Sequence, residues 1–276
     1  MLSKALEQSV NLIPWSMRRR IKDVPVVASL QRWFFANFLS GREFLHQINA
    51  GPAKGLTYPI SLPLDKLIWT GAYEVNLATA IASAVKDGDI CYDIGAYRGF
   101  FSGVLALAGA AEVIAFEPFP TNFEQLERLV SNNPDLPLKI QNIAIGRNNG
   151  IAEFTVMADS SMGKLATSSF QSEIAGESVL TIPVRTLDTL VEEDGYTAPN
   201  VLKIDVEGAE VDVLEGARRI LEGNRPRLFI EAHSHELGER CFEILDEFGY
   251  EVSFLNPGTS LDKLAPTDVS HLIARP

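Results

Sequence analysis

Asp93-Ile94-Gly95-Ala96-Tyr97-Arg98-Gly99 forms a predicted turn between a short apolar strand over 90–94 and a helix over 100–108. Gly95 allows a tight turn and the close approach of a ligand, and Gly99 allows the helix to begin close to the sheet. The dinucleotide pattern G-x-G-x-x-G is absent, and no Gly-Lys-Ser/Thr follows as in a phosphate-binding loop. Because an acid precedes the turn, we expect a ligand with a cationic amino group and no pyrophosphate cradle.

Strands and helices alternate on both sides of this turn. Helices are predicted over 73–85, 100–108, 121–131 (with Thr121 as N-cap), 209–221 and 236–248. Strands are predicted over 90–94, 113–116, 138–145, 201–204, 228–230, 250–255 and 271–274, with two further antiparallel strands over 151–157 and 178–185. Such alternation indicates βαβ units. We therefore expect an α/β, Rossmann-like fold with a mostly parallel seven-stranded sheet and helices on both faces.

The chain divides in sequence into a predicted N-terminal helical extension and connection, 1–69, and a main domain, 70–276. Residues 1–50 contain seven Lys or Arg against three Asp or Glu, together with aromatic residues at 33–35 and 38. They could form a peripheral membrane or partner-binding arm. The irregular apolar stripe instead favours helices that pack on the main domain. No apolar run is long enough to cross a bilayer, and the features of a signal peptide are absent.

Composition narrows the class of protein. The formal net charge of −12 repels nucleic-acid phosphates, so we expect no nucleic-acid partner. The two cysteines, Cys91 and Cys241, lie in apolar patterns without a partner at metal-ligand or redox spacing. They are predicted to be reduced core residues, which fits a cytoplasmic protein.

An acid follows the second predicted strand. Glu117 lies 22 residues after Gly95, where an acidic side chain can accept hydrogen bonds from both hydroxyls of an adenosine ribose. NAD and S-adenosylmethionine both fit this pair, but the missing third glycine and the acid at 93 favour S-adenosylmethionine. After the third strand, Asn142 either lies beside an adenine or satisfies local backbone groups. The predicted cofactor-binding residues are Asp93, Gly95, Tyr97, Gly99, Glu117 and Asn142.

The ends of the fourth and fifth predicted strands are rich in acids and imidazoles. Asp205, Glu207 and Glu210 follow the fourth strand, and Glu231, His233 and His235 follow the fifth. In an open α/β sheet these ends lie side by side at the ligand-binding edge. Asp205, Glu231 and His233 are therefore predicted to be catalytic, whereas Glu210 and His235 fit structural roles at helix starts. Asp205 and Glu231 could bind a divalent metal such as Mg²⁺, or His233 could act as a general base without metal.

The chain resembles the FkbM family of methyltransferases over about 70–255. The matching pieces are Gly71-Ala72-Tyr73-Glu74, the 93–99 turn, Phe116-Glu117-Pro118, Asn142-Ile143-Ala144-Ile145-Gly146, 185–190, 203–210 and Glu231-Ala232-His233. The resemblance implies a class I methyltransferase fold, S-adenosylmethionine as methyl donor and an O-methylated sugar or small molecule. Tyr97 and Arg98 depart from the Asn that family members often carry in the first loop, so contacts there are expected to differ.

Two other functions are compatible with parts of the sequence. A nicotinamide-dependent oxidoreductase could use a similar sheet but should carry the absent G-x-G-x-x-G pattern. A non-catalytic module that binds a membrane or partner through residues 1–50 would not need the acids and His233. The sequence leaves open the acceptor, the use of metal and the oligomeric state. The 158–178 loop and residues 40–70 are the inserts expected to shape the acceptor pocket.

Overall fold

The computed structural model describes residues 43–156, 163–165, 178–260 and 265–276. The chain separates into two compact units, Met1–Tyr73 and Glu74–Pro276. Residues 1–42 of the expected N-terminal arm, and nearly all of the 158–178 loop, lie outside the described residues. Among the helices described, none combines the length and apolar character needed to cross a membrane.

The described part of the first unit is a hairpin followed by a short helix. Strand β1 (Glu43–Gln47) pairs antiparallel with β2 (Thr57–Ser61), and helix α4 (Lys66–Trp69) follows. The prediction of helix over 1–50 is therefore wrong for 43–47. The turn that Gly51 and Gly55 permit, both at positive φ, returns the chain so that the β-forming residues of β2 pair with this segment.

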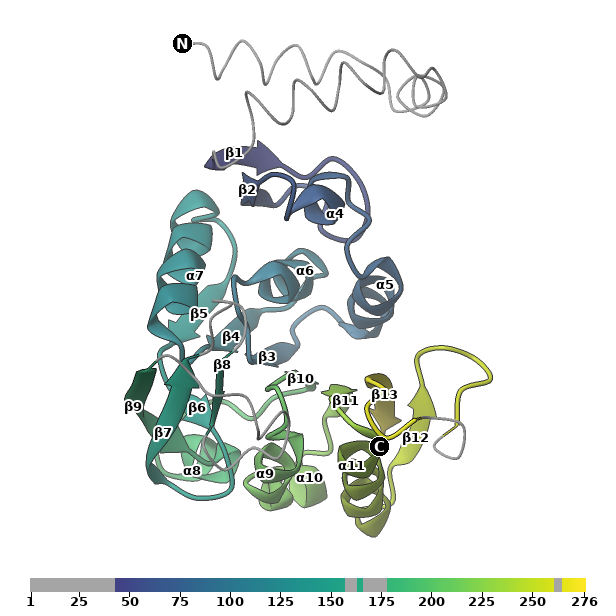
Figure 1. Cartoon of the computed structure of the whole chain (residues 1–276). Helices are drawn as coiled ribbons and strands as arrows, with labels where there is room; N and C mark the ends of the chain where they lie inside the picture. The colour runs from purple at the N-terminus through teal and green to yellow at the C-terminus, as the bar shows by residue number, and fades with distance from the viewer. Residues whose placement is uncertain (1–42, 157–162, 166–177, 261–264) are drawn as a thin grey trace, which may run out of the picture. The chain divides into compact units, whose positions relative to one another are not determined.

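The second unit is a three-layer α/β domain (Figure 1). One face of its sheet is covered by α5 (Val75–Ala84), α6 (Phe100–Leu107) and α7 (Pro120–Asn132). The other face is covered by α8 (Leu187–Glu192), α9 (Glu210–Glu215), α10 (Arg218–Gly223) and α11 (His235–Glu247). The expected layers, with helices on both faces, are confirmed.

The sheet has seven strands in the order β12-β13-β11-β10-β3-β4-β5. Their bounds are β3 Ile90–Ile94, β4 Glu112–Phe116, β5 Leu138–Gln141, β10 Val201–Ile204, β11 Arg227–Ala232, β12 Glu251–Phe254 and β13 Ser270–Arg275. All neighbours pair in parallel except β13, which is antiparallel to both β11 and β12. The expected class I methyltransferase fold is thus confirmed, and the strand order reverses between β3 and β10.

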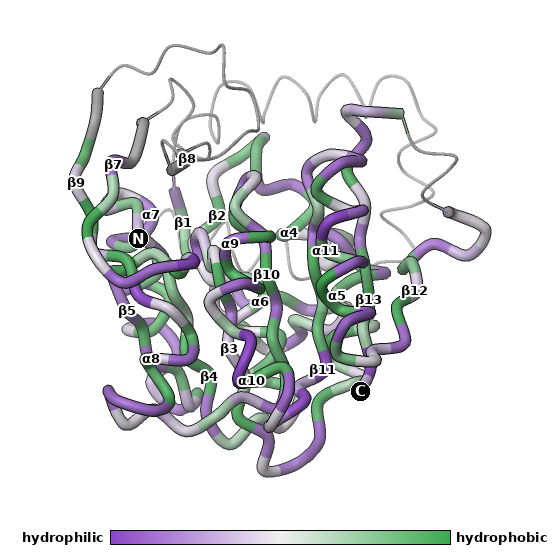
Figure 2. Tube along the Cα trace, turned by 90° about the horizontal axis from the view of Figure 1, so that it is seen from below, coloured by the Kyte–Doolittle hydropathy of each residue, from purple (hydrophilic) through white to green (hydrophobic). Residues whose placement is uncertain are grey.

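The central strands are buried on both faces, as a covered parallel sheet requires. Val201–Ile204 is fully buried along β10, and Figure 2 shows hydrophobic residues along the strands while α11 alternates in hydropathy. Cys91 and Cys241 are both free and buried, as predicted. The carboxyl ends of the strands are therefore where polar side chains gather.

Three predicted elements differ in detail. The helix expected over 209–221 is two helices, α9 and α10, because the Asp188 carboxylate accepts the main-chain N–H groups of Arg219 and Ile220 and starts a second helix. Helix α7 begins at Pro120, a favourable first position, so the prediction of Thr121 as N-cap is wrong.

The strand expected over 138–145 is also divided. Residues 138–141 form β5, whereas β6 (Ala144–Ile145) joins a second sheet of order β6-β9-β7-β8. In that sheet β7 (Gly150–Val156) and β9 (Ser178–Arg185) pair antiparallel, as predicted, and β8 (Gly163–Leu165) adds to β7.

Replacing Gly95 by alanine should destabilise the protein more than the same change at Gly88. Both glycines have a positive φ, +76° and +88°, which costs an alanine roughly 1–2 kcal/mol. A Cβ atom on Gly95 would lie 1.7 Å from the carbonyl oxygen of Asp205, whereas one on Gly88 would meet nothing within 4 Å. Urea unfolding should show a clearly larger loss of unfolding free energy for Gly95→Ala. Equal losses would contradict the close approach of the turn to the end of β10.

Candidate active site

The 93–99 turn is fixed by main-chain bonds between β3 and β4. The N–H groups of Gly95 and Ala96 both donate to the carbonyl of Phe116, each at 3.0 Å. Tyr97 adopts a positive φ of 50°, uncommon for a side-chain-bearing residue, and its N–H donates to Glu117 Oε2 at 2.8 Å. Gly99 caps α6, where a Cβ would meet Leu126 and Leu129 at 2.5 Å. The turn is therefore held by Glu117 as well as by its glycines.

Glu117 is buried, only 5% exposed, beneath this turn. Its Oε1 accepts the N–H of Phe119 at 2.9 Å and approaches the amide of Asn122 at 3.4 Å. Burial raises the pKa of Glu117 to about 7 despite these bonds. A carboxylate can accept about four hydrogen bonds. Three of these positions are used, so about one remains for a hydroxyl donor such as that of a ribose.

Two predicted cofactor residues make hydrogen bonds within the protein, one of them buried (Asp93) and one exposed (Asn142). Asp93 has no exposed surface, and its Oδ2 accepts the hydroxyl of Ser102 at 2.6 Å. It would therefore act on a ligand only through its neighbours. The amide of Asn142 donates to the main-chain oxygens of Glu117 and Pro118, at 2.8 and 3.2 Å. That is the backbone role, the second of the two expected for this residue.

Lys203 links the turn to the end of β10. Its buried Nζ lies 3.0 Å from Asp205 Oδ2, 3.4 Å from Asp93 Oδ1 and 3.3 Å from the carbonyl of Gly95. Burial alone would lower the pKa of Lys203, but the carboxylates of Asp205 and Asp93 outweigh it and raise the pKa. The sequence analysis assigned no role to this lysine, although its position two residues before Asp205 in a buried strand is the signal that places both on one face.

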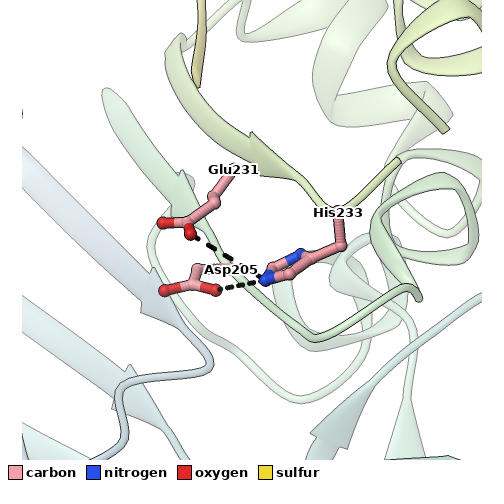
Figure 3. A group of neighbouring side chains, drawn as sticks. All are labelled: Asp205, Glu231 and His233. Carbon is pink, nitrogen blue, oxygen red and sulfur yellow. Dashed lines mark ion pairs between the residues drawn. The ribbon is translucent and has the colours of Figure 1, made fainter. Parts of the chain in front are cut away.

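The three predicted catalytic residues come together at the ends of β10 and β11 (Figure 3). His233 Nε2 lies 3.6 Å from Asp205 Oδ1 and 3.9 Å from Glu231 Oε1. A third carboxylate, Glu207 Oε2, lies 3.3 Å from the same nitrogen. His233 itself is only 5% exposed, while the three carboxylates are partly exposed. One imidazole nitrogen therefore faces an acidic, accessible cluster.

The other imidazole nitrogen is held by a buried acid. Glu210 has no exposed surface, and its Oε1 lies 2.7 Å from His233 Nδ1 and accepts the N–H of Gly208 at 2.9 Å. Glu210 was expected to be structural at a helix start, and it does begin α9, but it also orients His233. An acid in this position fixes which nitrogen carries the proton when the imidazole is neutral.

His271 also belongs to this cluster of acids and imidazoles, although it was not predicted from the sequence. It lies on β13 opposite Glu231, and its Nε2 is 3.2 Å from Glu231 Oε2. The only signal in the sequence would have been the antiparallel register of β13 on β11, which cannot be read from spacing alone. The site thus contains a chain of alternating imidazoles and carboxylates from His271 to Asp205.

The charges of the cluster shift its proton affinities. Burial acts to lower the pKa of His233, but the hydrogen bond that its Nδ1–H donates to Glu210 and the charges of Glu210, Asp205 and Glu207 raise it to about 9. Burial raises the pKa of Asp205 and of Glu207. The pKa of Glu231 is lowered, because the His271 contact outweighs the effect of burial. His233 is therefore mostly an imidazolium at neutral pH.

The cluster also has the donor set of a divalent cation. One ligand atom from each of Asp205, Glu231 and His233 can be chosen so that all three lie within 4.8 Å of one another. The oxygen-rich set suits a hard cation, with imidazole as a further ligand. An ion there would compete with the proton on His233 Nε2.

Comparison with known proteins finds a family model that matches more than half of the chain. The sequence model described as "Methyltransferase FkbM domain" matches residues 93–252. The hexuronic acid methyltransferase AglP of Haloferax volcanii is 27% identical over 149 residues, which is 54% of this chain and 58% of that protein. The chain thus matches less than two thirds of the length of this curated relative.

Two solved structures with a similar chain path are distant from this chain in sequence. The methyltransferase FkbM of Methylobacillus flagellatus KT is 19% identical, with a TM-score of 0.49, over 70% of this chain and 45% of that one. The tRNA (uracil-54, C5)-methyltransferase of Pyrococcus abyssi, solved with S-adenosyl-L-homocysteine, is 15% identical, with a TM-score of 0.45, over 84% and 44%.

Glu210→Gln should lower the pKa of His233 from about 9 toward its ordinary value of 6.5, because the largest favourable contact of the imidazolium loses its charge. A titration of the His233 ring by NMR measures this directly. Since the folded pKa is raised, the stability that it confers is complete below pH 6.5 and is lost as the pH rises through 9. A rise of this size corresponds to about 3 kcal/mol, and the decline should flatten in the variant.

Glu239→Gln is the matched control for this titration. Glu239 lies 3.5 Å from His235 in an exposed carboxylate–imidazole pair at the start of α11. This change should leave the His233 titration unaltered. A His233 pKa that stays near 9 in Glu210→Gln would show that the other carboxylates alone keep the imidazole protonated.

Proposed function

Because the chain belongs to the FkbM methyltransferase family, we propose that it transfers a methyl group from S-adenosylmethionine to a hydroxyl oxygen of a small molecule or sugar. The observation that carries the proposal is that His233, oriented by Glu210, lies in a cluster with Asp205, which Lys203 links to the turn that Glu117 closes. Lys203 contacts both the turn and Asp205, so the predicted cofactor site and the predicted catalytic cluster adjoin.

The residues around the turn suit an adenosyl ligand. Glu117 would accept a ribose hydroxyl at the acceptor position that the N–H groups of Tyr97 and Phe119 and the amide of Asn122 leave unused. Tyr97 is 37% exposed at the mouth of the turn and would offer its ring to the ligand. S-adenosylmethionine, when bound, would supply a methyl group already activated by its sulfonium. The protein then has to position the acceptor and remove its proton.

His233 is the base that the geometry favours. Glu210 holds Nδ1 and directs Nε2 toward the partly exposed carboxylates, an arrangement that resembles the orienting acid and base of a hydrolytic triad. The neutral imidazole would take the hydroxyl proton on Nε2, and Asp205 and Glu231 would orient the acceptor. A positioned base of this kind contributes about 10²–10⁴-fold to the rate.

A divalent metal ion would occupy the position of the proton on His233 Nε2. If a divalent ion such as Mg²⁺ is bound, Asp205, Glu231 and His233 would hold it, and it would polarise the acceptor hydroxyl. The charge-assisted contact between His233 and Glu210 favours the protonated imidazole instead. We therefore assign the cluster to proton transfer, with a small-molecule or carbohydrate acceptor and no nucleic-acid partner.

The family favours this assignment over the two other functions. An FkbM domain match over 93–252 supports methyl transfer rather than nicotinamide chemistry. The curated relative is described as a hexuronic acid methyltransferase, which supports a carbohydrate acceptor. A role for residues 1–50 at a membrane stays a prediction, since 1–42 lie outside the described residues.

Glu117→Gln should weaken binding of S-adenosylhomocysteine by about 10- to 100-fold, the range expected when hydrogen bonds to a charged group are lost. Isothermal titration calorimetry measures the affinity. Glu112→Gln is the control, because Glu112 begins the same strand at the opposite end and pairs with Lys139 at 2.9 Å. Absence of binding to the wild-type protein would reject the cofactor, and equal affinity of both variants would reject the role of Glu117.

The rate of methyl transfer should rise about tenfold per pH unit until the His233 proton is lost near pH 9. The sign follows from the neutral imidazole being the active form and the minor one below its pKa. His233→Ala should abolish the rise and lower kcat by about 10²–10⁴-fold. Asp205→Asn should lower kcat without removing the rise. The assay uses radiolabelled methyl donor with EDTA present, and a flat profile from pH 6 to 9 would exclude His233 as the base.

A further inference from the structure

A pocket of about 240 Å³ lies where β12 ends and β13 begins. Its volume falls below the roughly 300–1,000 Å³ of pockets for drug-sized ligands, so it suits a single ring-sized group. Most of the side chains that line it can form hydrogen bonds, and an aromatic ring adds an apolar wall. The hydrogen-bonding residues are Asn256, Thr259, Asp268, Ser270 and His271, and the apolar ones are Phe254 and Val269.

This pocket lies at the same edge of the sheet as the catalytic cluster. Because β13 runs antiparallel to β11, its first residues lie beside the end of β11, with His271 opposite Glu231 and Ser270 opposite Ala232. His271 lines the pocket and also contacts Glu231 Oε2 at 3.2 Å. A ligand in the pocket would be separated from the carboxylate cluster by this one imidazole.

One residue that lines the pocket has a buried polar atom without a partner among the described residues. Ser270 is only 4% exposed, and its Oγ forms no hydrogen bond to any described residue. An unsatisfied buried hydroxyl costs free energy, so native proteins seldom keep one without a ligand, water or other use. Together with the polar side chains of Asn256 and Thr259 in the same lining, it favours a ligand with hydrogen-bonding groups over an apolar one.

The charges around the pocket favour an uncharged ligand. Its described lining contains Asp268 and no lysine or arginine, and the adjoining cluster adds Glu231, Asp205 and Glu207. Asp268 Oδ2 is already used by the N–H of Ala265 at 2.8 Å. An anionic ligand would be repelled by these carboxylates and would find no guanidinium or ammonium group among the described lining residues.

We propose that this pocket binds an uncharged, polyhydroxylated part of the methyl acceptor, such as a neutral sugar ring. The inference rests on the proposed methyltransferase function and narrows its substrate class. Ser270, Asn256 and Thr259 supply the hydrogen-bonding groups, and His271 positions the ligand relative to Glu231. The preference for a neutral ring would separate this chain from its relative described as a hexuronic acid methyltransferase.

The test uses the full-length protein saturated with S-adenosylhomocysteine, with methyl glucoside and methyl glucuronide as probes. Saturation-transfer NMR and calorimetry measure their binding. Thr259→Trp fills the pocket and should weaken glucoside binding at least tenfold. Ser83→Trp is the matched control, since Ser83 lines a separate pocket of about 330 Å³ with Arg227, at the opposite end of β11. This control should leave glucoside binding unchanged.

Ser270→Ala separates a binding role from a structural one. It should weaken glucoside binding roughly three- to tenfold, the effect of one lost hydrogen bond, without lowering the free energy of unfolding. All three variants should bind S-adenosylhomocysteine as the wild type does. The glucuronide should bind more weakly than the glucoside.

The failures are distinguishable. If S-adenosylhomocysteine does not bind the wild type, the proposed function fails and this inference fails with it. If it binds, but the glucoside does not bind or binds Thr259→Trp equally well, the pocket is not the acceptor site. Tighter binding of the glucuronide would overturn the assignment of a neutral ligand.

Discussion

The ammonium group of Lys203 holds together the two halves of the site. It is buried between the carboxylates of Asp93 and Asp205 and reaches the carbonyl of Gly95, so it joins the end of β3 to the end of β10 where the strand order reverses. An unpaired charge in this place would be strongly destabilising, and each member is needed to neutralise the others. The close approach of Gly95 to the Asp205 carbonyl is the steric counterpart of this electrostatic link. Together they set where the 93–99 turn and the acidic cluster around His233 lie relative to each other.

The predictable parts of the fold are those in which the local pattern of hydrophobic residues and glycines determines the secondary structure. The seven strands of the main sheet follow from short apolar runs, and the turn at Gly95 follows from a backbone that only glycine tolerates there. The errors arise where contacts with residues far away in the sequence determine the secondary structure. Asp188 starts a new helix at α10 from 31 positions away, and pairing with β2 makes a strand of β1. No local pattern contains that information.

The site shows the same division. Asp205, Glu231 and His233 were predictable because neighbouring parallel strands end at one edge. Glu210 was seen but read as a helix-start acid, since the sequence does not show that its oxygen faces His233. His271 was out of reach because β13 returns antiparallel over 40 positions to meet Glu231. The sequence therefore identifies the edge of the sheet where these residues lie. The structure adds which imidazole nitrogen faces which carboxylate oxygen.

The charge balance at this edge of the sheet explains why the pKa of His233 is raised although its side chain is buried. Three carboxylates face His233 Nε2 and a fourth holds Nδ1, so the resting imidazole keeps its proton and the buried acids remain neutralised. A base with a pKa near 9 is strong but mostly protonated at neutral pH. A like charge nearby disfavours the protonated form of an imidazole. On the proposed function, a cationic methyl donor in the adjoining turn would therefore make His233 release its proton more readily when the donor is present. The acidic cluster would in this way couple occupancy of the cofactor site to the strength of the base.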